Sequence, residues 1–230
     1  MIILVLLILA AIAFAVAWFS MSDFLDFPNR KYFGVFLVRN INELTPSMLQ
    51  RIEKLSNQLS RKYDPMVISF ERLHKGGDKA LAICMPQDMV AQLPELNLLE
   101  LEDYSEKVFM SRVLSYDLSL TSSKFSLSDF RFENITLEPD EHLFFQIVTS
   151  PFKGSSQTSF RVAIVATDSG RRIAIAKKLE QDLRKMNLIK SKVKQSSLKN
   201  FESFKKRGVV PREVKKLSLT NEELLKILLG

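Results

Sequence analysis

The sequence has few of the residues from which metal and redox sites are built. Its 230 residues include one cysteine, Cys84, and two histidines, His74 and His142. A single cysteine excludes a disulfide within the chain and is typical of a reducing compartment. Cys84 stands in the apolar run ALAIC, so we interpret it as a buried core thiol. The histidines lie far apart without cysteines or carboxylates at ligand spacing, so no metal site is predicted.

The sequence also lacks the motifs of common enzyme classes. HKGGDK, residues 74–79, does not have the G-x-x-x-x-G-K-[ST] spacing of a phosphate-binding loop, and neither G-x-S-x-G nor H-E-x-x-H occurs. The acidic residues Glu100, Glu102 and Asp103 alternate with leucines, which is more typical of the solvent face of a strand than of a metal site. We therefore predict no catalytic residues and no cofactor, and expect that the protein is not an enzyme.

Charge is absent from the first 22 residues, MIILVLLILAAIAFAVAWFSMS. An apolar stretch of this length can span a bilayer as a helix, and Trp18 and Phe19 stand where an interfacial aromatic belt is expected. Arg30 and Lys31 follow it and favour a cytoplasmic location for the rest of the chain. We predict a single-pass anchor at residues 1–22 in the inner (cytoplasmic) membrane.

Two alternatives concern this N-terminal segment. The AVA triplet resembles the cleavage site of a signal peptide, but a basic region in front of the apolar run is missing. The alanines of the segment would allow close helix packing and a homo-oligomer, or they could simply face lipid.

A short linker at 23–31 leads to a pattern that predicts an α+β fold. Buried-strand runs, an amphipathic helix capped by Thr45 with Pro46 at its first position, and a Gly-Gly hairpin follow in the order β-α-β-β-α-β. This order predicts a ferredoxin-like unit at 32–105, with an antiparallel sheet. Strand patterns around 108–120, 141–152 and 158–168, and a helix from Ser169, predict a second, smaller antiparallel α+β unit at 106–188 that packs on or continues the first sheet.

The net charge of +7 comes from one segment. Residues 171–216 hold 16 Lys and Arg against 4 Asp and Glu, so an anionic partner is to be sought there. This segment could contact nucleic-acid phosphates or anionic lipid headgroups, or be a solvated helix face followed by a linker. The candidate anion-binding residues are Arg171, Arg172, Lys177, Lys178, Arg184, Lys185, Lys205, Lys206 and Arg207.

The last region, 189–230, is predicted to be a basic linker followed by a C-terminal helix. Thr220 and Glu223 have the spacing of a capping box. Leu224, Leu225 and Leu228 would form an apolar face on this helix. Such a face could bind a protein partner, or it could pack against the helix's own domain; the sequence does not decide between them.

Four segments resemble the N-terminal region of membrane-anchored ATPases from conjugative, type IV secretion-like DNA-transfer systems. They are LELEDY (99–104), FFQIVTSPF (144–152), KNFESFKKR (199–207) and LSLTNEELLKIL (217–228). In that family the last segment introduces the ATPase core, which this sequence does not contain. The resemblance therefore implies either a fragment of a longer protein or a separate scaffold or anchor without catalytic activity, whose terminal helix would recruit an ATPase in trans. The alternative is a membrane-tethered adapter that binds nucleic acid through residues 171–216.

Overall fold

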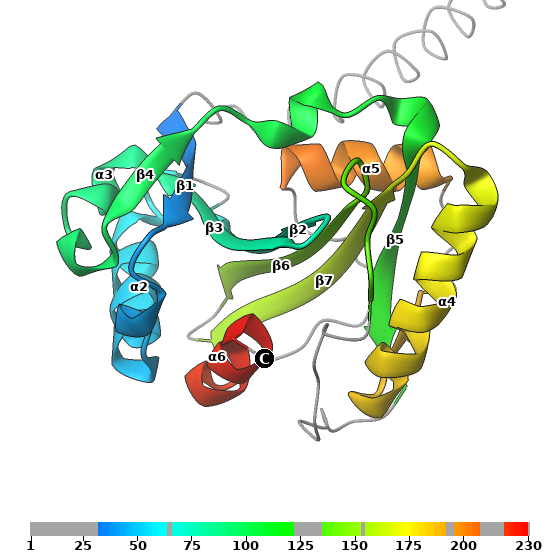
Figure 1. Cartoon of the computed structure of the whole chain (residues 1–230). Coiled ribbons are helices and arrows are strands. Elements are labelled where there is room, and N and C mark those ends of the chain that lie inside the picture. Colours follow the sequence, from blue (N-terminus) through cyan, green and yellow to red (C-terminus); the bar gives the residue numbers. More distant parts are fainter. Residues whose placement is uncertain are drawn as a thin grey trace, which may run out of the picture.

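The structure is a computed structural model, and it describes residues 32–63, 66–121, 135–152, 155–191, 196–207 and 219–229. The described strands form one eight-stranded antiparallel sheet in the order β4-β1-β3-β2-β6-β7-β5-β8 (Figure 1). The sequence thus correctly predicted an α+β fold with an antiparallel sheet. The predicted anchor at 1–22 lies outside the described residues. Within the described part of the chain, no helix is both long enough and apolar enough to cross a membrane.

The first half supplies one end of the sheet. Strands β1 and β3 pair in the centre of this half, with β4 on one side of them and β2 on the other. This pairing agrees with the expected β-α-β-β-α-β order. The elements are β1 (Phe33–Val38), α2 (Pro46–Leu59), β2 (Ile68–Lys75), β3 (Asp78–Pro86), α3 (Gln87–Val90) and β4 (Leu98–Leu101), with short 3-10 turns η2 (Ile41–Glu43) and η3 (Pro94–Leu96).

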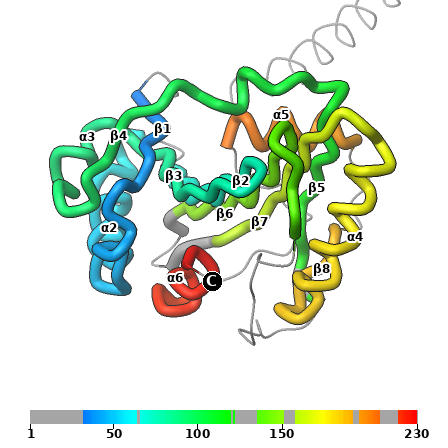
Figure 2. Tube along the Cα trace, viewed as in Figure 1, coloured from blue at the N-terminus to red at the C-terminus, as the bar shows by residue number. Residues whose placement is uncertain are grey.

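The second half continues the same sheet. Strand β6 pairs with β2 from Ile68↔Thr149 to Lys75↔His142, which joins the two halves edge to edge. Strands β6 and β7 form a long hairpin, and β8 lies beside β5 at the far edge (Figure 2). The elements are η4 (Tyr104–Lys107), η5 (Met110–Arg112), β5 (Val113–Leu120), β6 (His142–Phe152), β7 (Ser155–Val165), α4 (Ser169–Lys185), β8 (Leu188–Lys190), α5 (Ser197–Lys206) and α6 (Asn221–Leu229).

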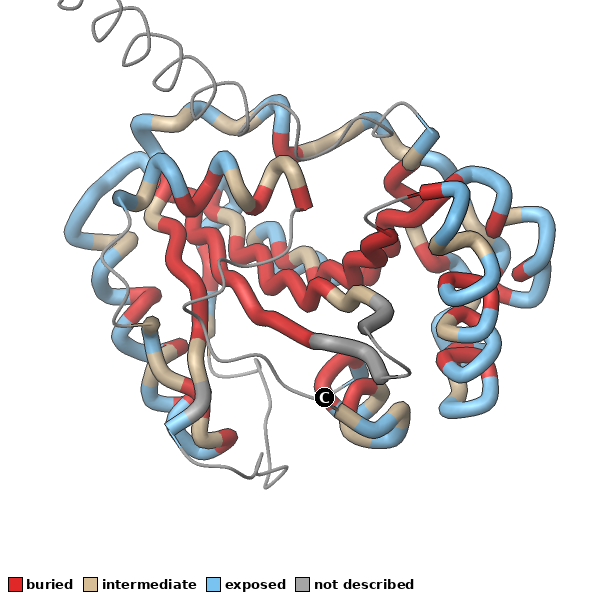
Figure 3. The backbone as a smooth tube through the Cα atoms, turned by 180° about the vertical axis from the view of Figure 1, so that it is seen from behind, coloured by how far each residue is buried: buried red, intermediate tan, exposed pale blue. Residues whose placement is uncertain are grey.

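One face of the sheet carries the main hydrophobic core. Alternate residues of the strands, such as Phe145 and Ile147 on β6, point to this face, because side chains along a strand alternate between its two sides. Helices α2, α4 and α6 cover it, and the central strands are buried along most of their described length (Figure 3). The core is therefore shared by both halves of the chain.

The opposite face of the sheet is covered by α5 and by the turns η4 and η5. Phe201 and Phe204 of α5 pack against Phe144 of β6, and Tyr104 of η4 joins this aromatic cluster. This face also holds the buried charged residues described below. The segment 189–216 was expected to be a linker, and this was wrong for β8 and α5, which are ordered elements of the fold.

Helix starts follow the sequence signals. The backbone N–H of Met48 donates to Thr45 Oγ1 at 3.2 Å, and Pro46 occupies the first turn of α2. At the start of α6, Glu223 N–H donates to Thr220 Oγ1 at 3.2 Å and Thr220 N–H donates to Glu223 Oε2 at 2.8 Å. The predicted capping box is therefore confirmed.

Candidate functional site

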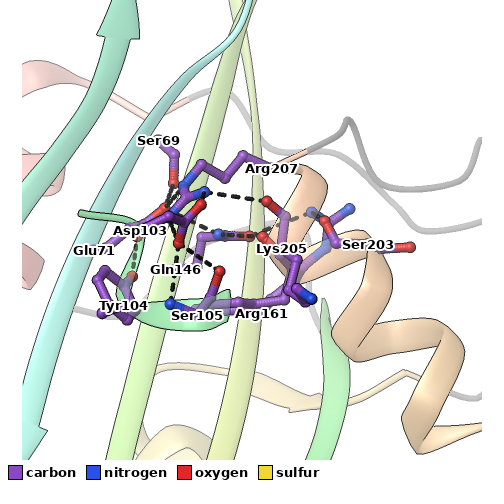
Figure 4. A network of polar contacts seen from close by, with 11 residues as sticks. Ser69, Glu71, Asp103, Tyr104, Ser105, Gln146, Arg161, Ser203, Lys205 and Arg207 are labelled. Carbon is purple, nitrogen blue, oxygen red and sulfur yellow. Dashed lines mark hydrogen bonds and ion pairs between the residues drawn. The ribbon is translucent and has the colours of Figure 1, made fainter. Parts of the chain in front are cut away.

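Glu71 lies at the centre of a buried polar network on the α5 face of the sheet (Figure 4). Its position on β2 points away from the main core, and its side chain has no exposed surface. Ser69 Oγ donates to Glu71 Oε1 at 2.6 Å, and Gln146 Nε2 of β6 donates to the same oxygen at 3.1 Å. The Tyr104 hydroxyl donates to Glu71 Oε2. A buried carboxylate needs such partners because burial disfavours its charged form.

Arg207 supplies the opposite charge from the end of α5. It is the C-cap residue and has a left-handed backbone with φ 51°, an uncommon conformation for any residue other than glycine. Its Nε donates to Glu71 Oε1 at 2.8 Å, and its Nη1 donates to Asp103 Oδ2 at 2.6 Å. Burial lowers the pKa of Arg207, but the charge of Glu71 and the bond to Asp103 outweigh it and raise that pKa well above its ordinary value. Arg207 therefore carries its positive charge at neutral pH.

Asp103 connects this network to the turn η4. Its Oδ1 caps the turn by accepting the Ser105 N–H at 3.0 Å and the Ser105 hydroxyl at 2.6 Å. Burial raises the pKa of Asp103, but the hydrogen bond and charge of Arg207, with the Ser105 bonds, hold it at about 2. Asp103 was expected on the solvent face of a strand. That expectation was wrong, because β4 ends at Leu101 and the chain turns over the sheet.

A second buried pair lies further along the same face. Arg161 Nε of β7 donates to Asp117 Oδ1 of β5 at 2.9 Å, and both side chains are almost fully buried. Burial raises the pKa of Asp117 and lowers that of Arg161, and each charge opposes the shift of the other. Arg161 Nη1 also donates to Gln146 Oε1 at 3.3 Å and to the Ser203 carbonyl at 2.9 Å. The pair thus binds α5 to the sheet.

Helix α5 is held along its whole length by such contacts. At its start, Ser197 Oγ accepts the Ser115 N–H at 2.8 Å, and Asn200 Nδ2 donates to the Ser115 carbonyl at 3.3 Å. Near its end, Gln146 Nε2 donates to the Phe204 carbonyl at 3.0 Å. Arg207 closes the last turn. Three of the four segments on which the family resemblance rests, 99–104, 144–152 and 199–207, therefore meet in one place.

Each charged side chain in this network has a fixed partner of opposite charge. A general acid or base must exchange protons near neutral pH, and Asp103, with a pKa of about 2, does not titrate there. The described residues contain no group of three or more His, Cys, Asp or Glu side chains that could hold a metal ion. The contacts therefore account for the network as a structural clamp that fastens α5 and η4 to the sheet.

Two cavities flank the clamp. The smaller one, which we call the Arg207 cavity, has a volume of about 230 Å3 and is lined by Arg207, Asp103, Ser69 and Cys84 among others. Cys84 is buried, as the sequence predicted. The larger one, the hairpin groove, has a volume of about 760 Å3. It is bounded by the β2–β3 hairpin, residues 104–112, the turn at 139–142 and the end of β7.

Both histidines are among the residues that line the hairpin groove, His142 on the face of Phe144 and His74 on the opposite face of β2, beside Leu143. Burial and the neighbouring charges of Arg72 and Lys79 lower the pKa of His74 to about 4. Burial and the charge of Lys75 also lower the pKa of His142. Both imidazoles are consequently neutral at pH 7. Their positions could not be predicted from the sequence, since they depend on the pairing of β2 with β6, in which His74 lies opposite Leu143 and His142 opposite Lys75.

The leucines proposed for partner binding lie against the protein's own core. Leu224 and Leu228 are buried in the main core and Leu225 is partly buried, in a helix that contacts α2. Arg72 Nη1 donates to the Ile227 carbonyl at 2.8 Å, which satisfies an orphan carbonyl in the last turn of α6. Of the two alternatives, the structure has the helix packed on its own domain. These leucines do not form an exposed docking face here.

The candidate anion-binding residues are divided between the two faces of the sheet, because α4 covers one face and α5 the other. Arg207 is buried in the clamp, which corrects its assignment to an anion-binding surface. Lys205 pairs with Glu106 at 2.8 Å, and Lys206 lines the Arg207 cavity. On α4, Arg171 pairs with Glu141 at 2.7 Å. The nine residues therefore do not form one phosphate-binding surface.

The other basic residues of α4 are arranged as follows. Arg172 Nη1 donates to the Thr167 carbonyl at 3.2 Å, and Lys185 pairs with Asp182 at 2.8 Å. Lys177, Lys178 and Arg184 are exposed. A cationic surface remains on α4, and it is smaller than the sequence indicated.

Sequence reasoning missed Glu71, Gln146, Arg161 and Asp117. Each is a polar residue inside an apolar strand, in the stretches SFERL, FFQIV, SFRVAIV and SYDLSL. A charged residue at such a position is rarely buried without a partner, so pairing these residues with one another was the available signal.

Comparison with known proteins finds no family model that matches this chain and no curated protein that matches its sequence. The functional interpretation therefore depends on the residues and their arrangement.

Proposed function

We propose that this chain is a non-catalytic, single-pass membrane protein whose cytoplasmic body scaffolds a membrane-associated DNA-transfer or secretion machine. In this role it would bind a protein partner, an ATPase supplied in trans, at the inner membrane. The apolar segment 1–22 would be the anchor, and the α+β body would present the binding surface.

The observation that carries the proposal is the convergence at the clamp. Segments 99–104, 144–152 and 199–207 were singled out because they resemble one region of a DNA-transfer ATPase family. In the fold, Arg207 donates to Asp103, and both Arg207 and Gln146 donate to Glu71, so the three segments are linked. Residues that fit a family pattern for a shared structural reason are expected to contact each other. Their contacts support the resemblance, because chance matches would be scattered over the fold.

The chemistry of the clamp supports a scaffolding role. Charged groups that are buried in pairs fix the relative position of distant segments, and removing one partner leaves an uncompensated charge. Glu71 and Arg207 are 136 positions apart in sequence. The clamp therefore joins segments from both halves of the chain, as expected of a platform on which another protein assembles.

The test is affinity capture of the tagged full chain from its native membrane, followed by mass spectrometry. We expect a P-loop ATPase of a DNA-transfer or secretion system to co-purify. A chain that ends at Lys216 would lack α6 and could serve as a control for partner binding by that helix. It is unsuitable, because Leu224, Ile227 and Leu228 of α6 belong to the core. The better control is an unrelated single-pass protein of similar size captured with the same tag. Capture of no ATPase above this control would contradict the proposal.

The second candidate function is a membrane-tethered adapter that binds nucleic acid without sequence preference. It is favoured by the exposed Lys177, Lys178 and Arg184 of α4. Such binding would weaken steeply with salt, because each neutralised phosphate releases counterions. The variant Lys177→Glu/Arg184→Glu would abolish it. The test is a binding measurement with single- and double-stranded DNA. If neither binds at low salt, or if the variant binds as well as the wild type, this candidate function is rejected.

A further inference from the structure

The hairpin groove has an apolar floor. Leu73, Phe144 and Val165 come from three neighbouring strands and share the face of the sheet that α5 covers further along. Val108 closes one side. Phe144 lies against Tyr104, with ring centroids 5.0 Å apart, so the floor is continuous with the aromatic cluster beneath α5. The floor is therefore fixed in place by the clamp, through the Tyr104–Glu71 hydrogen bond.

An exposed aromatic side chain stands at the edge of this floor. Phe109 is 70% exposed, the most exposed of the large hydrophobic side chains in the described part of the chain. The Arg112 guanidinium lies 5.4 Å from the centre of its ring, which is a cation–π distance. A large apolar side chain held in this way beside an apolar groove is typical of a binding surface rather than of a random surface position.

The rim of the groove is cationic. Four basic residues, Lys75, Lys79, Lys107 and Arg112, line it against two acidic ones, Asp78 and Asp140. Lys79 lies opposite His74 in the β2–β3 hairpin, so its side chain leaves the strand on the other face of the sheet. Lys107 pairs with Glu102, but both side chains are at least 70% exposed, so water screens this pair strongly. The groove therefore combines an apolar floor with a surplus of positive charge.

We propose that the hairpin groove is the docking site for an acidic peptide segment of a protein partner, with an aromatic or large aliphatic side chain of that segment seated on the floor between Phe144 and Phe109. This proposal rests on the proposed function, since the segment would belong to the partner that the scaffold binds. Aspartate and glutamate side chains flanking the anchor would face Lys75, Lys107 and Arg112.

Charge and shape together select this occupant. A nucleic acid would require a broad cationic surface, whereas Asp78 and Asp140 interrupt the basic rim and the floor is apolar. A purely apolar ligand would use the floor alone and make no contact with the basic side chains of the rim. The volume of about 760 Å3 lies within the range of specific binding pockets, roughly 300–1,000 Å3. Aromatic anchors surrounded by complementary charge are the usual arrangement of peptide-binding hot spots.

A peptide-binding measurement tests this directly. The probe is a fluorescein-labelled octapeptide, Gly-Asp-Phe-Glu-Asp-Phe-Glu-Gly, titrated by fluorescence anisotropy with the full chain in phosphatidylcholine nanodiscs. We expect saturable binding. The rim variant Lys75→Glu/Arg112→Glu should weaken it at least tenfold, and Phe109→Ala should weaken it severalfold. The matched charge-reversal control on the other face of the sheet, Lys177→Glu/Arg184→Glu, should change it less than twofold.

Three results would overturn the proposal. They are no saturable binding, equal binding by the rim and control variants, and equal binding of a peptide with serine in place of both phenylalanines. Circular dichroism of each variant excludes misfolding as the cause of a loss. A preference for DNA over the peptide at the rim would also reject it.

Affinity capture from native membranes separates this proposal from the proposed function. If the ATPase co-purifies equally with the wild type and the rim variant, the groove is not its docking site and the scaffold function stands. If the peptide binds at the rim but no ATPase co-purifies with the wild type, the scaffold function fails and the groove remains an acidic-peptide site. Loss of the ATPase from the rim variant alone supports both.

Discussion

Replacing Arg207 with methionine tests whether the buried clamp holds the two halves of the fold together. The substitution keeps most of the side-chain length and removes the charge that Glu71 and Asp103 share. Glu71 would then be fully buried without a counter-charge, although Ser69, Gln146 and Tyr104 would still donate to it. Breaking a buried ion pair on one side costs about 3–5 kcal/mol. Because three donors remain, we expect about 3 kcal/mol.

The assay is urea-induced unfolding of the full chain in dodecyl maltoside, followed by circular dichroism at pH 7. The matched control is Arg51→Met, which breaks the exposed Arg51–Glu95 pair and should leave the midpoint almost unchanged. The double variant Glu71→Gln/Arg207→Met should be more stable than Arg207→Met alone, because it removes the uncompensated carboxylate together with the guanidinium. A loss below about 1 kcal/mol for Arg207→Met, or a double variant that is less stable than the single one, would refute the reasoning.

Three further predictions concern α6, α5 and acid stability. Leu228→Ala should cost about 2–4 kcal/mol of unfolding free energy in the same urea assay, because the side chain is buried against α2; a neutral result would mean that α6 is detached from the core. Phe204→Ala should cost about 3–5 kcal/mol and also weaken peptide binding in the hairpin groove, since Phe204 supports Phe144; unchanged near-UV circular dichroism and binding would contradict this. The pKa of His74 is lowered to about 4, whereas in the unfolded chain it is about 6.5. Between these pH values the unfolded chain binds a proton that the folded chain does not. Roughly 2–3 kcal/mol of unfolding free energy is therefore lost as the pH falls from about 6.5 to 4. The variant His74→Gln should flatten this part of the profile of urea midpoint against pH. The further loss of stability between about pH 4 and 2 should persist, because Asp103, with a pKa of about 2, loses its stabilising charge there. An unchanged profile would count against the burial of His74.

Local patterns predicted the elements of the first half well. The strand β1, the capped helix α2 and the β2–β3 hairpin each carry their own signal, in buried-strand runs, in Thr45-Pro46 and in the paired glycines. The capping box at Thr220 was also predicted correctly from the sequence. These features depend on residues that are near one another in sequence, and so a single sequence is sufficient to find them.

Helix α5 was not predicted from the sequence, because its lysines are typical of an exposed segment although the helix packs on the sheet. Residues 197–206 include three lysines, and only Phe201 and Phe204 mark the apolar side. Ser196 as N-cap, with its side chain accepting the Lys199 N–H at 3.3 Å, was the available signal. A short helix of this kind gains its stability from tertiary contacts rather than from propensity, which is why local sequence reasoning assigned it to a linker.

The clamp and the groove could not be derived from local patterns. Glu71 meets Arg207 only because β2 pairs with β6 and α5 crosses the same face. Likewise, Leu73 and Phe144 lie side by side on the groove floor through strand pairing, although 71 positions separate them in the sequence. Such pairings follow from the topology of the whole sheet, and the strand patterns by themselves leave its order open.

The most direct test of the scaffold account, with the hairpin groove as its docking site, is site-specific photocrosslinking in the native cell. A photoactivatable amino acid is placed at Phe109 on the rim of the hairpin groove or at Lys177 on α4, two exposed positions on opposite faces of the sheet. The account predicts a crosslink from position 109 to an ATPase of a DNA-transfer or secretion machine, and none from position 177. Nucleic-acid adducts at position 177 without any protein adduct at position 109 would contradict it.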